Sequence, residues 1–206
     1  MSEQENKSAM IRKFVAAKLE WLHKMPENAY RAELANLRRG AGKKPGDLPE
    51  LWGTILQNMP EEFYVKNGEA SKEEWAVYTV LTTFAVHQQG HSQSEWMSTD
   101  CPFGSAVRRL APNDDELDDE LEDELARVLR RFNAFATSAD IEEASHYLRG
   151  LAQLLRGADM PFDYPALAVD LYCFQFPGSA PKVRLKWGQD FYRIKKKENT
   201  EENTEQ

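Results

Sequence analysis

The sequence is poor in the residues and runs that mark several classes of protein. Only two of its 206 residues are cysteines, Cys101 and Cys173, and no C-x-x-C spacing occurs. This favours two reduced thiols and argues against a disulfide framework or a cysteine-based zinc site. No apolar run approaches the roughly 20 residues of a membrane span, and the N-terminus lacks the apolar core of a secretory signal. We therefore expect a cytoplasmic protein.

Positive charge is also in short supply overall, since 26 Lys and Arg stand against 34 Asp and Glu, for a net charge of −8. Much of the acidic excess is local. The run from Asp114 to Glu124 holds nine acids and no base, and residues 198–206 hold four more, so the rest carries 21 acids against all 26 bases. Local potential decides what a surface attracts. A mildly basic body with two acidic segments is therefore compatible with a nucleic-acid partner.

Motifs that carry catalysis are absent or incomplete. His87 and His91 stand four positions apart, as in a helical zinc pair, but Gln88 occupies the place of a metalloprotease glutamate. The glycine-rich loop at 40–46 is similar to a phosphate loop, yet Lys44 stands where a magnesium-binding Ser or Thr is needed. Consecutive acids on a helix point all around it and cannot converge on one ion. The sequence predicts no catalytic centre, no metal and no cofactor, and a metal enzyme using the two histidines remains an alternative.

Helical periodicity runs through nearly the whole chain, and no strand pattern is convincing. Proline and glycine interrupt it, and Ser71 with Glu74 has the form of a capping box that opens an apolar helix. We predict helices over residues 8–24, 26–40, 50–57, 71–85, 103–110, 113–135, 140–156, 165–176 and 181–192.

The fold class predicted is all-α, with two small helical bundles packed as an elongated two-part subunit. Pro112 and Asn113 mark the best boundary. We expect an N-terminal helical domain with a basic glycine-rich loop over residues 1–112 and a C-terminal helical bundle over residues 113–194. The charged residues 195–206 are expected to form a disordered tail.

Cations are spread over several predicted helices, as a phosphate-backbone binder requires. Residues 31 and 38 lie two helical turns apart, and the charge continues into the glycine loop. His146 and Gln153 share one helix face with two arginines, opposite a leucine stripe. The predicted nucleic-acid-binding residues are Arg31, Arg38, Arg39, Lys43, Lys44, Arg108, Arg109, Arg149, Arg156, Arg184, Lys186 and Arg193.

Each basic group has a simpler alternative. Arginines on the polar face of an amphipathic helix are usually only solvated. Trp187 and Phe191 could stack bases among the last cations, but four-residue spacing favours a place in the core. Arg31 could pair with Glu27 or Glu33 on its own helix. It is the repetition of cations on successive elements that favours nucleic-acid binding.

Seven segments of this chain resemble the CasB family, the small helical subunit of the type I-E CRISPR surveillance complex, Cascade. They follow the family order over about residues 11–193, whereas the acidic run and the tail from Lys195 look unlike the family core. The segments are 31–43 (RAELANLRRGAGK), 84–89 (FAVHQQ), 104–110 (GSAVRRL), 131–135 (RFNAF), 146–156 (HYLRGLAQLLR), 165–171 (PALAVDL) and 187–193 (WGQDFYR).

The resemblance implies a non-catalytic, two-part helical subunit, present as two copies beside the repeated backbone subunit that holds the guide RNA. It implies contact with the large subunit as well. Its role would be to stabilise the R-loop by contacting the guide RNA–target DNA region and the displaced single strand without sequence preference. The alternative is a helical protein–protein adaptor that binds no nucleic acid.

Overall fold

The regular secondary structure of the described residues is helical. The computed structural model describes residues 2–65, 67–111 and 119–193, and in these residues it contains no β-strand, only an isolated bridge between Ser98 and Phe162. The predicted all-α fold is confirmed. In chain order the elements are α1 (Glu3–His23), α2 (Glu27–Gly40), η1 (Pro49–Leu51), α3 (Trp52–Leu56), η2 (Glu61–Phe63), α4 (Lys72–His87), α5 (Phe103–Arg108), α6 (Asp119–Ala136), α7 (Ile141–Gly157), α8 (Tyr164–Phe174) and α9 (Ala180–Tyr192).

Local capping explains where the helices begin. The predicted capping box is present at α4, where the Ser71 hydroxyl accepts from the Glu74 amide and the Glu74 carboxylate accepts from the Ser71 amide. The same device opens α1 with Ser2 and Glu5, so this helix begins at Glu3 and the predicted start at residue 8 was wrong. The predicted start of a helix at residue 113 and the predicted tail from residue 195 lie outside the described residues.

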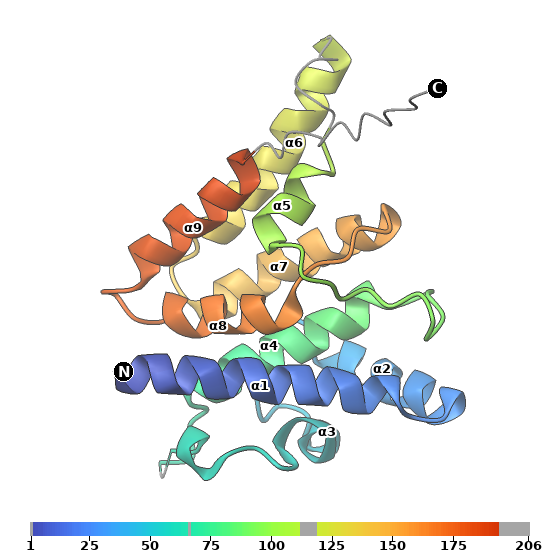
Figure 1. The fold of residues 1–206 in the computed structure, drawn as a ribbon, viewed down its shortest axis with the longest axis vertical. Coiled ribbons are helices and arrows are strands. Elements are labelled where there is room, and N and C mark those ends of the chain that lie inside the picture. The colour runs from blue at the N-terminus through green and yellow to red at the C-terminus, as the bar shows by residue number, and fades with distance from the viewer. Residues whose placement is uncertain (1, 66, 112–118, 194–206) are drawn as a thin grey trace, which may run out of the picture.

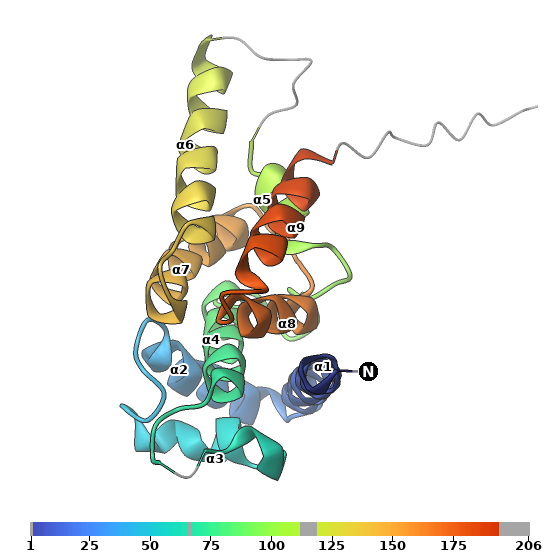
Figure 2. The same cartoon turned by 90° about the vertical axis from the view of Figure 1, so that its left-hand side faces the viewer.

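The helices are stacked along the long axis of the molecule. Figure 1 places α1, α2 and α3 at one end of this axis and α5, α6 and α9 at the other, with α4, α7 and α8 between them, and Figure 2 agrees from the side. α1 packs along α8, α4 contacts α2, α7 and α8, and α5 packs against α9. None of the helices in the described ranges is long and apolar enough to cross a membrane.

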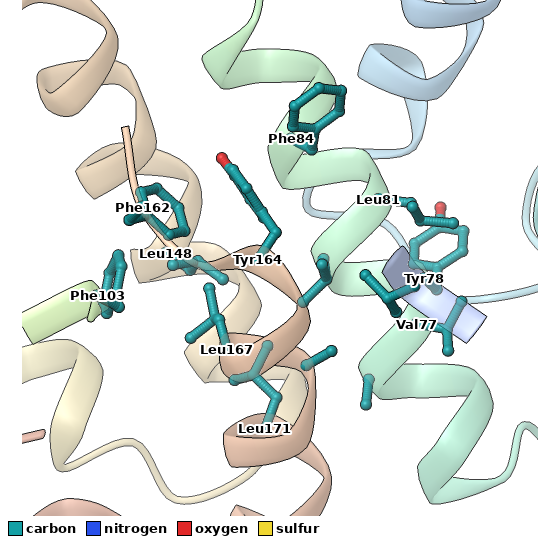
Figure 3. Packing of buried hydrophobic residues seen from close by; sticks show 14 of the residues in the cluster. Val77, Tyr78, Leu81, Phe84, Phe103, Leu148, Phe162, Tyr164, Leu167 and Leu171 are labelled. Carbon is teal, nitrogen blue, oxygen red and sulfur yellow. The ribbon is translucent and has the colours of Figure 1, made fainter. Parts of the chain in front are cut away.

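One apolar cluster connects these layers, with members from α1 through α9. Figure 3 shows its centre, where Tyr164 of α8 contacts Phe84 of α4 and Leu167 of α8 lies toward Leu148 of α7. Contacts of α4 with α7 and α8, and of α5 with α9, cross the predicted boundary at residues 112 and 113. The division into two bundles stays a prediction, and any such division has to cut through this core.

Candidate nucleic-acid interface

The glycine-rich loop after α2 is held in place by α4. The Tyr78 hydroxyl donates to the Gly40 carbonyl oxygen at 3.0 Å. A Cβ atom on Gly40 would lie 2.6 Å from the Leu51 Cδ1 atom and 2.7 Å from the Tyr78 hydroxyl, so the loop approaches its neighbours closely enough to need glycine. Gly42 then turns the chain with φ at +80°, in the region that favours glycine. The loop is thus a positioned element and not a loose connection.

The same loop runs along α7 in the opposite direction. The Arg149 guanidinium donates to the Ala41 carbonyl at 3.3 Å, and the Lys44 ammonium lies 2.8 Å from a Glu142 carboxylate oxygen. Below the loop, Ala41 packs with Val86 and Ala152. Residues 142, 149 and 156 of α7 are seven apart, which is two helical turns, so they face the loop along one line. Figure 2 shows the loop after α2 reaching the lower end of α7.

This alignment brings half of the predicted binding residues into one surface. The loop and the end of α2 contribute four of them, and the exposed face of α7 contributes two. We name this surface the α2–α7 basic patch, and its members are Arg38, Arg39, Lys43, Lys44, Arg149 and Arg156.

Two cations of the patch already have carboxylate partners. Arg39 is paired with Glu50 at 2.7 Å, and the charge and hydrogen bond of Glu142 raise the pKa of Lys44. Nearby, Arg31 is paired with Glu27, the first of its two predicted partners. All of these side chains are more than one third exposed, so water and salt screen their ion pairs strongly. A phosphate oxygen can therefore replace the carboxylate as the acceptor at little cost.

Arg38 and Arg156 are in a different situation, because they lie close together without a carboxylate between them. Partial burial, and secondly the charge of Arg156, lower the pKa of Arg38. The Arg156 guanidinium donates to the Gln89 side-chain carbonyl at 3.0 Å. In the described part of the chain, neither guanidinium forms an ion pair with Asp or Glu. The two cations therefore repel each other, and an anion bound beside them would relieve that repulsion.

A groove of about 470 Å³ opens beside Arg38, between α2 and the segment that follows α4. Arg156 does not line the groove, but it contacts Gln89, which does. Its wall is held by Gln88, whose amide donates to the carbonyls of Ser92 and Glu95 and whose oxygen accepts from the Met97 amide. Gln88 and Gln89 are not among the predicted binding residues. In the sequence they form a polar pair directly after an apolar helix, within the segment 84–89 that resembles the CasB family.

The other predicted cations lie elsewhere. Arg108 and Arg109 end α5, toward the opposite end of the long axis from α2 (Figure 1), and Arg108 donates to the Ala111 carbonyl at 3.3 Å. Arg184 donates to the carbonyl of Ala136, the last residue of α6, and to that of Ser138, just after the helix. Arg193 is exposed at the end of α9. The structure does not bring this group together with the α2–α7 basic patch.

Lys186 has a structural role. Its ammonium lies 2.7 Å from a carboxylate oxygen of Asp170, which also accepts from the buried Trp187 indole at 3.0 Å. Burial raises the pKa of Asp170, so this carboxylate needs a nearby cation to stay ionised. Trp187 and Phe191 are 0% and 1% exposed, which agrees with the core alternative and leaves neither ring free to stack a base. Phosphate contact by Arg184 and Lys186 stays a prediction, and in this structure both side chains already have protein partners.

The two histidines of the alternative metal site face different neighbours. The His87 ring stacks on Phe162, its Nδ1 atom lies 2.9 Å from the Tyr164 hydroxyl, and burial lowers its pKa to about 3. His91 faces the Asp159 carboxylate at 3.6 Å. Among the described residues no three His, Cys, Asp or Glu side chains converge as a metal-ligand group.

Comparison with known proteins adds an independent line of argument. A family model described as CRISPR-associated protein Cse2 matches residues 33–192. Among solved structures, the crystal structure of CasB from Thermobifida fusca is similar, with 30% sequence identity and a TM-score of 0.67. That match covers 89% of this chain and 98% of the other. Comparison with curated protein sequences found no match.

Proposed function

Because this chain belongs to the CRISPR-associated Cse2 family, and is thereby a CRISPR Cascade subunit, we propose that it acts there by binding nucleic acid. The binding has no sequence preference, and the subunit carries out no catalysis. Its effect is to stabilise the R-loop formed by guide RNA and target DNA, together with the displaced strand.

The α2–α7 basic patch is the observation that carries this proposal. Its cations come from α7 and from the end of α2 with its loop, which Tyr78 and Arg149 hold by hydrogen bonds to Gly40 and Ala41, so they form a stable surface. Cations that replace the counterions of a phosphate backbone bind it without reading its sequence. No base-reading motif accompanies the patch in the sequence. This combination suits a subunit that supports many different targets.

Modest contacts are sufficient for this role. R-loop formation exchanges one duplex for another of similar stability, a principle described for a different RNA-guided effector, so small protein contributions decide its direction. Within Cascade, the proposed partners are guide RNA, target DNA, the displaced strand, the repeated backbone subunit, the large subunit and a second copy of this chain. The cytoplasmic location stays a prediction.

Salt dependence of single-strand binding tests the proposal. Full-length protein is titrated into a fluorescently labelled oligothymidine at increasing salt concentrations. If all six cations of the patch contact phosphates, log K falls with log salt with a slope of about −4, since each contact to a single strand contributes about −0.7. Binding that is equal at low and high salt would contradict the proposal.

A second candidate function, that of a protein–protein adaptor, is favoured by one apolar surface. A groove lined by Leu48, Leu51 and Ile55 lies beside Trp52, whose side chain is 51% exposed. Exposed aromatic residues next to apolar grooves are typical of protein contacts. An adaptor without a nucleic-acid role would show no oligothymidine binding at any salt concentration, so the same titration separates the two functions.

A further inference from the structure

The arginine pair at the edge of the groove after α4 lacks the partner that its charge requires. Arg38 is partly buried, and its side chain forms no hydrogen bond or ion pair with the described residues. Arg156 spends one nitrogen on Gln89 and faces Arg38 with the same charge. Elsewhere on α2 and its loop, Arg39 and Lys44 are paired with carboxylates, and Lys43, which has no ion pair among the described residues, is exposed to water. Arg38 differs from Lys43 because it is partly buried beside a like charge, and this marks a place prepared for an external anion.

The groove beside this pair contains a second unpartnered polar group. Tyr30 of α2 is 1% exposed and lines the groove, and its hydroxyl has no hydrogen-bond partner in the described structure. A buried hydroxyl without a partner costs free energy, so a ligand that forms a hydrogen bond with it recovers that cost. Around it the groove is lined by apolar carbon of Leu34, by Arg31, by the 88–92 segment and by Glu95, whose carboxylate accepts from the Ser92 amide.

We propose that this groove is a nucleotide subsite, in which Arg38 and Arg156 hold one backbone phosphate and the groove above Tyr30 takes the adjoining base. The inference rests on the proposed function, because it places one nucleotide of the bound single strand. It goes beyond that function by turning part of a dispersed surface into a defined pocket.

The chemistry of the lining fits a nucleotide better than an isolated anion. Two guanidinium groups offer forked donors to phosphate oxygens, and guanidinium planes also stack on bases. Tyr30 and Gln89 line the same groove, and a base that displaces the atoms covering the buried Tyr30 hydroxyl can present its edge to that hydroxyl and to the Gln89 amide. A volume of about 470 Å³ lies within the range of small-ligand pockets. DNA and RNA share this chemistry, so the ligand class is a nucleotide of either single strand.

The test compares three single variants of the full chain, Arg38→Gln, Arg156→Gln and Tyr30→Phe, with a matched control. Arg130→Gln is the control because it removes the same charge from a residue that is exposed on α6, outside the groove. Binding is measured with labelled oligothymidine and with oligouridine of the same length, which separates DNA from RNA as the source. We expect each groove arginine variant to weaken binding about 10-fold and to flatten the salt slope by about 0.7, against a change under about 2-fold for the control.

Tyr30→Phe keeps the ring and all charges, so it tests only the hydrogen bond between the Tyr30 hydroxyl and the bound base. We expect about 3-fold weaker binding with an unchanged salt slope, because a hydrogen bond is lost and no phosphate contact changes. Melting temperatures of the free variants provide the structural check. Arg38→Gln removes a partly buried charge that is repelled by Arg156, so the melting temperature of this variant should equal or exceed that of the unmodified protein.

Three outcomes would overturn the subsite. Arg38→Gln and Arg156→Gln would bind no worse than the control, or Tyr30→Phe would bind like the unmodified protein, or the loss of binding would follow a loss of thermal stability. Salt-dependent binding by the unmodified protein would still stand in these cases and support the proposed function. If the unmodified protein binds no oligonucleotide at all, both the proposed function and the subsite fail.

Discussion

Gly104 offers a sharp test of how α5 and α9 hold the upper half of the molecule together. A Cβ atom on Gly104 would lie 2.5 Å from the Trp187 carbonyl oxygen and 3.0 Å from the Phe191 amide nitrogen. Both are backbone atoms of α9, so they cannot yield unless the helix moves. We therefore expect Gly104→Ala to push the two helices apart and to weaken the hydrogen bond from the Ser105 hydroxyl to the Asp190 carbonyl, now 2.7 Å.

The magnitude follows from two opposing effects. Overpacking of a well-packed contact costs about 1–3 kcal/mol, and alanine regains about 0.5–1 kcal/mol over glycine within a helix. We expect a net loss of about 1–2 kcal/mol in the free energy of unfolding. For a chain of this length the melting temperature should fall by about 2–8 °C.

Gly150→Ala supplies the matched control. Gly150 is exposed in the interior of α7, and a Cβ atom there would meet nothing within 4 Å. The same substitution should therefore stabilise the protein by about 0.5–1 kcal/mol. Thermal and urea unfolding, followed by circular dichroism, measure both variants. The reasoning is refuted if Gly104→Ala is as stable as the unmodified protein, or if the two variants shift in the same direction.

Three further predictions concern charge. Changing four cations at the end of α2 and in its loop to Ala should weaken the R-loop in assembled Cascade, while native mass spectrometry still finds the subunit in the complex; the residues are Arg38, Arg39, Lys43 and Lys44. Loss of the subunit from the complex would show that these residues form a protein interface instead. Neutralising Asp118, Asp119, Glu122 and Asp123 in the acidic run at 114–124 should raise non-specific DNA binding by the free subunit, because these charges repel phosphates. An unchanged or lower affinity would contradict this prediction. For His87, burial lowers the folded-state pKa from 6.5 to about 3, so the unfolded state takes up the proton first as pH falls. Stability should be complete above pH 6.5 and decline from there toward pH 3, by at most about 1.4 kcal/mol per pH unit, and His87→Gln should flatten the melting-temperature profile in that window.

Local signals in the sequence were enough for most of the helices. The capping box at Ser71, the proline before α2 and the glycines after it act over a few residues, so their effects can be predicted without knowing the fold. The start of α1 was missed because a second capping box, at Ser2, lies before the first apolar residue of the pattern.

Only part of the candidate site could be predicted from local sequence signals. Charge spacing identified the loop cations, but the approach of Arg149 to Ala41 joins residues 108 positions apart, and nothing local encodes it. The internal partners of Arg184 and Lys186 likewise depend on how α6, α8 and α9 pack. A cation on a helix face looks the same in sequence whether it meets solvent, a carbonyl or a buried carboxylate.

The contact between the loop and α7 has a consequence for the order in which this protein becomes functional. Residues 38–44 are synthesised long before residues 142–156, and the rigid surface exists only when both are present and docked. A nascent or truncated chain that has completed α4 carries the loop cations without the α7 arginines that oppose and hold them. Under the proposed function, competence to hold a nucleic-acid strand therefore arrives only after α7 has been synthesised and has docked.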